Sequence, residues 1–312
     1  MADNLYQKIE GLFNYYNKFL QGKDKAIRLV LLSFFAKGHI LIEDNPGLGK
    51  TTLALAIAKS MGLNFGRIQC TNDLLPGDIT GLNIFNREKN SFEFIKGPIF
   101  NNIVLVDEIN RATPKTQSAL LEAMGEKQVT IEGKTYPMLK PFFVIATQNP
   151  SEQYGTFQLP ESQLDRFLMK ISIGYPDRLE EIAILKGGSS RGRIIQSQPV
   201  INEEEVLNLI KHIKDNIYVD EKILHFLMNI VEKTRNSSEI LIGLSTRAAL
   251  SIINVAKVSA FFSKRDFVIP EDILNYYEYT MPHRIVFKGR ITDDEKKEII
   301  SQIIKDTKLP YD

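Results

Sequence analysis

The sequence has very little cysteine, because Cys70 is the only one among 312 residues. A single cysteine cannot form an intrachain disulfide, which excludes the small secreted proteins that depend on disulfides and indicates a reducing compartment. We interpret Cys70 as a small buried hydrophobic residue.

A long uninterrupted apolar segment is also missing. The most apolar stretch, residues 27–42, is broken by Arg28 and by the polar segment 37–39, whereas a membrane-spanning helix needs about 20 mostly apolar residues. The first 20 residues lack the basic start, apolar core and cleavage site of a secretory signal. We therefore expect a cytoplasmic protein with no membrane segment of its own, which a membrane-bound partner could still recruit.

Neither sign of charge dominates, since 39 Lys and Arg residues balance 38 Asp and Glu residues to a net charge of +1. The basic residues are scattered, which disfavours a protein whose main task is to coat a nucleic-acid backbone. The 43% hydrophobic and 25% charged residues are typical of globular proteins. A length of 312 residues predicts one larger and one smaller domain.

Short β-branched and aromatic segments alternate with helical patterns in the first half of the chain. This alternation predicts an α/β fold, in which helices cover both faces of a parallel sheet. Chemistry is expected at the carboxyl ends of such strands. The predicted strands are residues 39–44, 65–70, 102–108, 142–148 and 167–173.

The pattern changes after Pro176, where a helix is predicted over residues 177–186. A glycine- and serine-rich segment follows, and we place a linker at 187–199. Beyond it only helices are recognisable, which begin at Asn202 or Glu203, at Asp220, at Ser245 or Thr246, and at Pro270. The expected domains are an α/β domain with an N-terminal helix at 1–186 and a four-helix lid at 200–312.

Two segments of the α/β domain depart from this alternation. Residues 79–95 contain two short alternating runs around a polar turn at 87–90. Residues 129–138 contain a second pair, which turns at Gly133 and follows a helix capped by Thr113. These patterns predict two exposed β-hairpins on one sheet.

A phosphate-binding loop is predicted where the first strand leads into a helix. Glycines let backbone N–H groups turn toward a phosphate, and the helix N-terminus adds partial positive charge. Lys50 would neutralise the β- and γ-phosphate oxygens, and Thr51 would hold Mg²⁺. Asp44 replaces the first glycine of the usual G-x-x-x-x-G-K-[ST] pattern, but Asp tolerates turn conformations, so we still expect ATP binding. The predicted nucleotide-binding residues are Asn45, Pro46, Gly47, Leu48, Gly49, Lys50, Thr51, Thr52 and Asp107.

Polar residues follow two of the other predicted strands. Asp107 would hold Mg²⁺ together with Thr51, and Glu108 would act as the base that activates the hydrolytic water. Asn149 would position this water against the γ-phosphate, although Asn149-Pro150 is also an ordinary turn signal.

Two arginines are candidates for a role at the phosphates. Arg166 lies directly before an apolar strand, where a guanidinium is costly to bury without a partner. One interpretation is an intramolecular salt bridge to Asp165 or Glu161. The other is an arginine finger that reaches the γ-phosphate bound by a neighbouring subunit, an interaction worth ~10³- to 10⁵-fold in rate. Arg247 begins a lid helix, against the preference of the helix dipole, and would report the phosphate state to the lid.

Several segments together resemble the MoxR family of AAA+ ATPases. They span residues 41–173, and residues 243–273 are similar to the lid of that family. The DEINRA and LPESQLDRF segments are specific to the family rather than general to P-loop proteins. The matching segments are LIEDNPGLGKT, LLPGDITGLNIF, FEFIKGPIF, VLVDEINRATPKTQSALLEAMGEKQVT, VIATQNP and QLPESQLDRFLMKI.

The resemblance implies an AAA+ P-loop core with a five-stranded parallel sheet and a C-terminal all-α lid domain. It also implies membership of the helix-2-insert group, in which two hairpins like those predicted here face the pore of the ring or a partner. By position, the resemblance makes Lys50 and Thr51 the Walker A residues, Asp107 and Glu108 the Walker B residues, Asn149 sensor 1, Arg166 the arginine finger and Arg247 sensor 2, acting within one subunit or between two.

We therefore expect a hexameric ring that hydrolyses ATP with Mg²⁺ to remodel or activate a protein client. MoxR-like proteins are similar in role to chaperones that assist metal insertion or complex assembly, and the resemblance implies a partner with a von Willebrand factor A domain. Two alternatives stay open. One is an ATP-gated scaffold with negligible turnover, which Glu108 disfavours; the other is a nucleic-acid motor, which the near-neutral charge disfavours.

Overall fold

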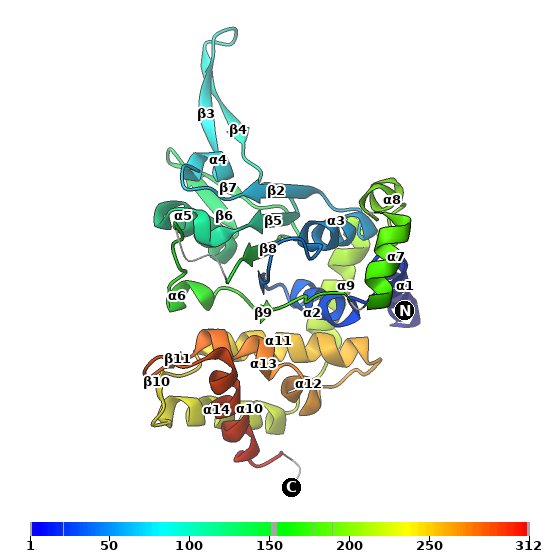
Figure 1. Cartoon of the computed structure of the whole chain (residues 1–312), viewed down its shortest axis with the longest axis vertical. Helices are drawn as coiled ribbons and strands as arrows, with labels where there is room; N and C mark the ends of the chain where they lie inside the picture. The colour runs from blue at the N-terminus through cyan, green and yellow to red at the C-terminus, as the bar shows by residue number, and fades with distance from the viewer. Residues whose placement is uncertain (1, 21, 151–154, 177, 189, 311–312) are drawn as a thin grey trace.

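The first half of the chain folds around a five-stranded parallel sheet, as predicted. The computed structural model describes residues 2–20, 22–150, 155–176, 178–188 and 190–310. The strands lie in the order β2-β5-β8-β1-β9 (Figure 1). Their bounds are β1 Ile40–Glu43, β2 Phe65–Gln69, β5 Ile103–Asp107, β8 Phe143–Gln148 and β9 Met169–Ile171.

Alternate residues of these strands enter two different hydrophobic clusters, because successive side chains of a strand point to opposite faces. Leu105 and Ile145 pack in the cluster that includes helices α1 (Ala2–Phe19), α2 (Asp24–Phe35) and α3 (Lys50–Ser60). Val104 and Val144 pack on the other face with α5 (Pro114–Glu126), which begins at the predicted cap Thr113. Both faces of the sheet are therefore buried, which explains the continuous apolar runs in the sequence.

The predicted hairpins are both present. The first consists of β3 (Gly81–Asn86) and β4 (Ser91–Lys96), and the second of β6 (Gln128–Ile131) and β7 (Lys134–Pro137). The first projects beyond the edge strand β2, at the opposite end of the molecule from the lid (Figure 1). The rings of Phe94 and Tyr136 stack with centroids 4.1 Å apart, so the two hairpins support each other near their base.

The C-terminal part is a mainly helical lid, in which three helices begin at predicted caps. Asn202, Asp220 and Ser245 each accept a hydrogen bond from a backbone N–H in the first turn. The helix expected from Pro270 ends at Leu274. The lid elements are α9 Glu203–Asn216, α10 Glu221–Asn236, β10 Ile240–Ile242, α11 Thr246–Phe262, α12 Glu271–Leu274, α13 Tyr277–Thr280, the 3₁₀ helix η2 Pro282–Arg284, β11 Val286–Phe287 and α14 Asp293–Lys305.

Two expectations for this half need correction. The lid is not entirely helical, because β10 and β11 form an antiparallel pair. The proposed linker at 187–199 is also not simply flexible: α7 (Arg178–Gly187) runs into its first residue, and α8 (Arg191–Gln196) lies within it. Ile194 of α8 is fully buried in the cluster that includes α3, so this connection is anchored to the core. In the part of the chain described, no helix is long and apolar enough to cross a membrane.

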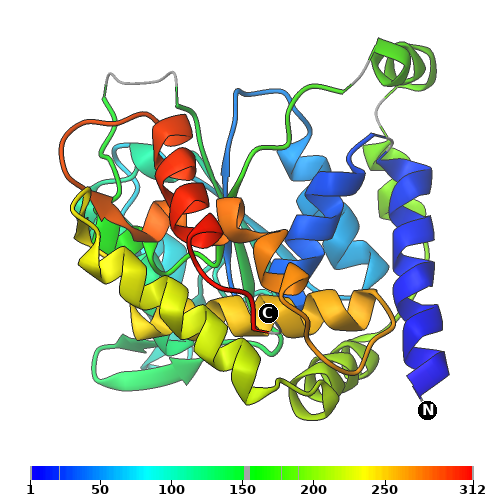
Figure 2. The same ribbon diagram turned by 90° about the horizontal axis from the view of Figure 1, so that it is seen from below.

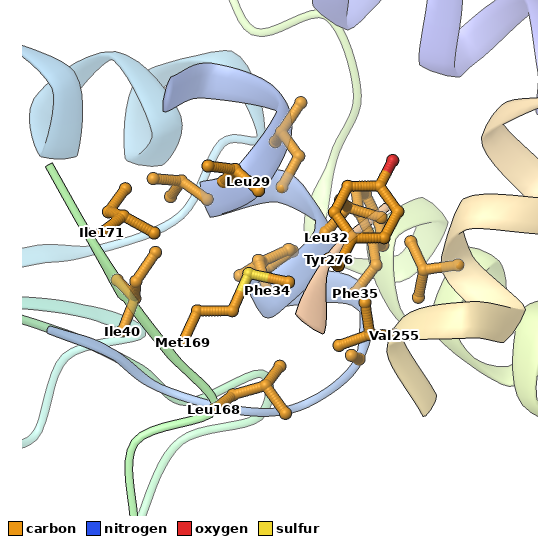
Figure 3. Close-up of a cluster of buried hydrophobic side chains, with 14 of the residues drawn as sticks. Leu29, Leu32, Phe34, Phe35, Ile40, Leu168, Met169, Ile171, Val255 and Tyr276 are labelled. Atoms are coloured by element: carbon orange, nitrogen blue, oxygen red, sulfur yellow. The ribbon is translucent and has the colours of Figure 1, made fainter. Parts of the chain in front are cut away.

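The lid and the α/β domain share one hydrophobic cluster (Figure 3). Phe35 of α2 and Val255 of α11 belong to it, together with Met169 of β9. Figure 2 shows lid helices lying across the core in the view from below. The rings of Phe35 and Phe262 lie 6.0 Å apart, which joins the end of α2 directly to a lid helix. The lid is therefore packed against the core rather than loosely tethered.

Replacing Phe35 with alanine should lower the free energy of unfolding by about 3–5 kcal/mol, the usual cost of removing a buried aromatic ring. Phe35 is 2% exposed, whereas Phe92 on the first hairpin is 69% exposed, so Phe92→Ala is the matched control. Urea unfolding followed by far-ultraviolet circular dichroism gives both values. A loss for Phe35→Ala no larger than that for Phe92→Ala would contradict the shared core.

Candidate functional site

The predicted phosphate-binding loop connects β1 to α3 at the carboxyl end of the sheet. Gly47 and Gly49 have φ angles of 89° and 87°, in the left-handed region that favours glycine. Gly49 is the N-cap of α3, so the loop turns directly into the helix N-terminus. Such a terminus has free N–H groups and a partial positive charge, which suit an anionic phosphate.

Asp44 has a structural role that explains the departure from the usual glycine. Its side chain is buried and accepts a hydrogen bond from the Ser172 hydroxyl at 2.6 Å and another from the Ile173 backbone N–H. Both partners directly follow β9, the strand beside β1. Asp44 therefore fixes the start of the loop to the neighbouring strand, which a glycine cannot do.

Replacing Asp44 with glycine, which restores the usual loop pattern, should weaken ATP binding rather than strengthen it. The substitution leaves the partly buried Ile173 N–H without its acceptor, which costs about 1 kcal/mol of unfolding free energy. Asp44→Asn keeps one acceptor oxygen and should lie between wild type and Asp44→Gly. Chemical denaturation and titration with a fluorescent ATP analogue measure both effects. An unchanged affinity in Asp44→Gly would show that this anchor does not shape the loop.

Lys50 lies at the first position of α3 and points back over the loop. Its ammonium group donates a hydrogen bond to the Asp44 carbonyl at 2.6 Å. Partial burial lowers the pKa of Lys50, and the carboxylates of Asp44, Asp107 and Glu108 oppose that shift. This cation therefore lies in a pocket that also contains the carboxylates predicted from the sequence.

Asp107 is the last residue of β5, Glu108 follows it, and residues of the two neighbouring strands contact both. The Thr147 hydroxyl accepts the Glu108 N–H at 3.0 Å and donates to Asp107 Oδ1 at 3.4 Å. Glu108 Oε2 accepts hydrogen bonds from Gln69 and Arg111, each at 3.1 Å. Glu108 also has a φ of 57°, an uncommon angle for a residue other than glycine, and such conformations concentrate at functional sites.

These residues surround a pocket of about 260 Å³. Asn149 also lines it and is buried, so the predicted candidate belongs to the site. Two residues of the predicted set do not line it: Asn45 is exposed, and Leu48 is buried. The pocket is lined by Pro46, Gly47, Gly49, Lys50, Thr51, Thr52, Arg67, Gln69, Asp107, Glu108, Thr147, Gln148 and Asn149.

Four of these lining residues were missed by the sequence analysis. Arg67, Gln69, Thr147 and Gln148 occupy the carboxyl-terminal parts of β2 and β8, on either side of β5. Arg67 Nε donates to Asp107 Oδ2 at 2.7 Å. Their place in the sequence could have indicated them, because polar residues near the carboxyl ends of the strands beside β5 are expected to lie close to Asp107.

Arg166 and Arg247 lie together, but they do not line the phosphate-loop pocket. Both line a second pocket of about 220 Å³, which also receives Arg284. The Arg166 guanidinium donates to the Leu121 carbonyl at 2.7 Å and lies where a side chain on Gly125 would collide with it. Among the described residues, Arg166 forms no ion pair with Asp165 or Glu161, which removes the intramolecular salt bridge considered above.

Comparison with known proteins gives matches over both parts of the chain. Residues 39–169 match the ATPase family associated with various cellular activities (AAA), and residues 232–303 match the AAA lid domain. The chain is 42% identical over 310 residues to the uncharacterized protein YeaC of Bacillus subtilis, covering 99% of this chain and 97% of YeaC. It is 37% identical over 305 residues to the chaperone MoxR1 of Mycobacterium tuberculosis, covering 94% and 80% respectively.

A solved structure agrees with these matches. The crystal structure of a candidate ATPase from Cytophaga hutchinsonii superposes with a TM-score of 0.89 at 38% identity, covering 99% of this chain and 96% of that one. The protein MoxR of Methylorubrum extorquens is a more distant relative, 27% identical over 313 residues, with 92% of this chain and 90% of the relative covered.

Proposed function

This chain belongs to the MoxR family of AAA ATPases, and we propose that it hydrolyses ATP at sites shared between neighbouring subunits of a hexameric ring. The energy released would change the conformation of a protein client. The proposal includes the cytoplasmic location expected from the sequence.

One observation carries the proposal of shared sites. The phosphate-loop pocket is lined by Lys50, Thr51 and Glu108, whereas Arg166 and Arg247 line a different pocket of the same subunit. A hydrolase that uses an arginine to stabilise the charge of the transition state, in which the γ-phosphoryl group passes from ADP to water, needs that guanidinium at the γ-phosphate. In a closed ring, the arginine pocket of one subunit would meet the phosphate-loop pocket of the next.

The residues of the phosphate-loop pocket suit the proposed reaction. Lys50 would neutralise the β- and γ-phosphate oxygens, and Glu108 would take a proton from the attacking water. The hydrogen bonds from Gln69 and Arg111 orient the Glu108 carboxylate and limit its rotation. Asn149, which lines the same pocket, would hold the water in line with the γ-phosphate.

The donor set in this pocket also fits Mg²⁺. This ion prefers oxygen ligands and is usually bound by one or two protein groups together with substrate phosphates. The Thr51 hydroxyl and the Asp107 carboxylate line one pocket, and Asp107 already attracts the cationic side chain of Arg67. Bound there, Mg²⁺ would neutralise charge on the phosphate oxygens of ATP.

The first hairpin is the best candidate for contact with the client. Its strands carry exposed large apolar side chains, including Phe85, Phe92 and Ile95, and the hairpin projects away from the sheet (Figure 1). Exposed apolar side chains of this size often mark a binding surface. One relative is named a chaperone, MoxR1, and we propose a client of the same general kind. We further propose that the client has a von Willebrand factor A domain and that the ATPase assists metal insertion or complex assembly. A client bound to a membrane could recruit the chain there.

The nucleic-acid motor is less well supported. Three lysines on and beside the hairpins could contact a phosphate backbone, but each has a partner within the chain: Lys89 pairs with Glu93 at 2.5 Å, Lys96 lies over the ring of Phe100 and Lys134 lies over the ring of Tyr136. With a net charge of only +1, the chain as a whole has little excess positive charge to attract a nucleic-acid backbone. The ATP-gated scaffold remains the main competitor, and turnover separates it from the ATPase.

Steady-state ATP hydrolysis over a wide range of protein concentration, with light scattering on the same samples, tests the proposal. Specific activity should rise together with the mass of the particle, because a lone subunit lacks an arginine at its phosphates. A constant activity from a species with the mass of a monomer would refute shared sites. ATP binding without turnover at every concentration would favour the scaffold.

A further inference from the structure

The lid holds the two residues on either side of Arg166. Arg284 of η2 donates a hydrogen bond from Nη2 to the Phe167 carbonyl at 2.8 Å. Its Nη1 atom lies 3.6 Å from Asp165 Oδ1. His283 Nε2 also contacts the Phe167 carbonyl, at 2.9 Å. The backbone that carries the proposed arginine finger is therefore attached to the lid at both neighbouring positions.

A second lid element contacts the same segment. Ser245, the N-cap of α11, donates from its hydroxyl to Asp165 Oδ2 at 3.4 Å. Arg247 lies two residues further along, in the first turn of that helix. Asp165, the neighbour of Arg166 in the chain, is thus contacted both by α11, which carries Arg247, and by η2, which carries Arg284.

The burial of Arg284 indicates that its polar contacts, and not only its volume, are needed at this position. Its side chain is 2% exposed, and a buried cation is costly unless it is paired and hydrogen-bonded. Burial lowers the pKa of Arg284 to about 10, with Asp165 opposing the shift and Arg247 adding to it. An apolar side chain of similar volume would fill this space without that cost. The guanidinium instead directs its contacts to Asp165, Phe167 and the neighbouring His283.

Arg284 and Asp165 form an ion pair without a hydrogen bond between Nη1 and Oδ1. Neither Arg284 Nη1 nor Asp165 Oδ1 has a hydrogen-bond partner among the described residues, although both atoms are buried. Arg284 also lines the same pocket as Arg166 and Arg247. Three guanidinium groups therefore converge on one small cavity, where an anion from outside the subunit would relieve their mutual repulsion.

We propose that Arg284 is a positioning residue for the arginine finger, which fixes residues 165–167 to the lid so that Arg166 and Arg247 reach the neighbouring subunit's phosphates as one unit. The inference rests on the proposed shared site. It makes the lid the element that sets finger position, because η2 and the start of α11 both contact Asp165.

The test exploits the fact that a misplaced finger harms the neighbour's site and leaves the subunit's own ATP site intact. The KM of Arg284→Gln for ATP should stay within about twofold of the wild-type value. Its kcat should fall on the order of 10²-fold, as expected for a misplaced catalytic group. Mixing it with Lys50→Ala, which should not bind ATP but has an intact finger, should raise the activity well above that of either variant alone, because some interfaces then join an intact ATP site to an intact finger. Lys50→Ala alone should be inactive.

Asp165→Asn is the second variant, because loss of a buried arginine could prevent folding. Its side chain is 20% exposed and keeps its shape, and it should show a smaller loss of kcat that Lys50→Ala also rescues. Melting temperatures establish that each variant is folded. The mixture of Arg166→Ala with Lys50→Ala serves as the reference for a shared site.

The outcomes are distinguishable. Rescue of Arg284→Gln, or of Asp165→Asn if the first does not fold, together with rescue of the reference supports the inference. Rescue of the reference alone overturns the inference and leaves the shared site standing, since the lid residues then act on their own subunit. Wild-type kcat in a folded Arg284→Gln or Asp165→Asn also overturns it. Failure of the reference itself overturns the shared site and this inference with it.

Discussion

Replacing Arg166 with alanine is expected to lower kcat for ATP hydrolysis by about 10³- to 10⁵-fold, the range measured for arginine fingers in nucleotide hydrolases. The affinity for ATP should stay close to that of wild type, because Arg166 does not line the phosphate-loop pocket of its own subunit. Single-turnover hydrolysis and equilibrium binding of a fluorescent ATP analogue measure the two quantities separately.

The matched control for this experiment is Arg193→Ala. Arg193 is exposed on α8 and lines neither the phosphate-loop pocket nor the pocket that contains Arg166, so its loss should change kcat little. If Arg166→Ala hydrolyses ATP within threefold of the control, a roughly 0.6 kcal/mol effect, the proposed finger is wrong.

Glu108→Gln is expected to lower kcat by about 10²- to 10⁴-fold, the usual contribution of a general base. Glutamine keeps the length of the side chain and can still accept hydrogen bonds from Gln69 and Arg111 through its amide oxygen, so the pocket should keep its shape. It cannot take the proton from water at neutral pH. ATP should therefore remain bound, and the assembled particle should accumulate in light scattering.

Glu122→Gln is the control for this substitution. Glu122 is exposed on α5, away from the pocket, and its replacement should leave hydrolysis unchanged. Turnover by Glu108→Gln at the wild-type rate would mean that another group activates the water.

The sequence predicted the central sheet well, because each of its strands carries a local signal. A strand buried on both faces needs apolar residues at successive positions, as in Val104 and Leu105. The helix caps Thr113, Asn202 and Ser245 were found for a similar reason, since capping depends on one side chain and the next few backbone groups.

The elements that were missed depend on contacts between distant segments. β10 and β11 contain only three and two residues, and they pair across more than 40 positions of sequence, too little for a periodic pattern to reveal. Helix α14 is an exception: it was not predicted, although Thr292 and Glu295 form a local capping box. The buried Ile194 of α8 lies in a short polar segment whose composition suggests a linker.

The residues of the candidate site also fall into a group with a local sequence signal and a group without one. The phosphate loop and the Asp107-Glu108 pair are contiguous motifs and were predicted, whereas Arg67 and Thr147 enter the site through strand order and register. Neither the meeting of Arg166 with Arg247 nor the burial of Arg284 beside them could be predicted, because these residues come from the core and from two separate lid elements.

Mixing Lys50→Ala with Arg166→Ala subunits tests the central claim most directly. Each variant lacks one half of the proposed shared site, so each should be nearly inactive alone. In a mixed ring, a site with Lys50 from one subunit and Arg166 from its neighbour is complete. We predict ATP hydrolysis that rises to a maximum at intermediate mixing ratios. Mixtures that remain as inactive as the two separate variants at every ratio, despite light scattering that demonstrates co-assembly, would contradict an active site built from two subunits.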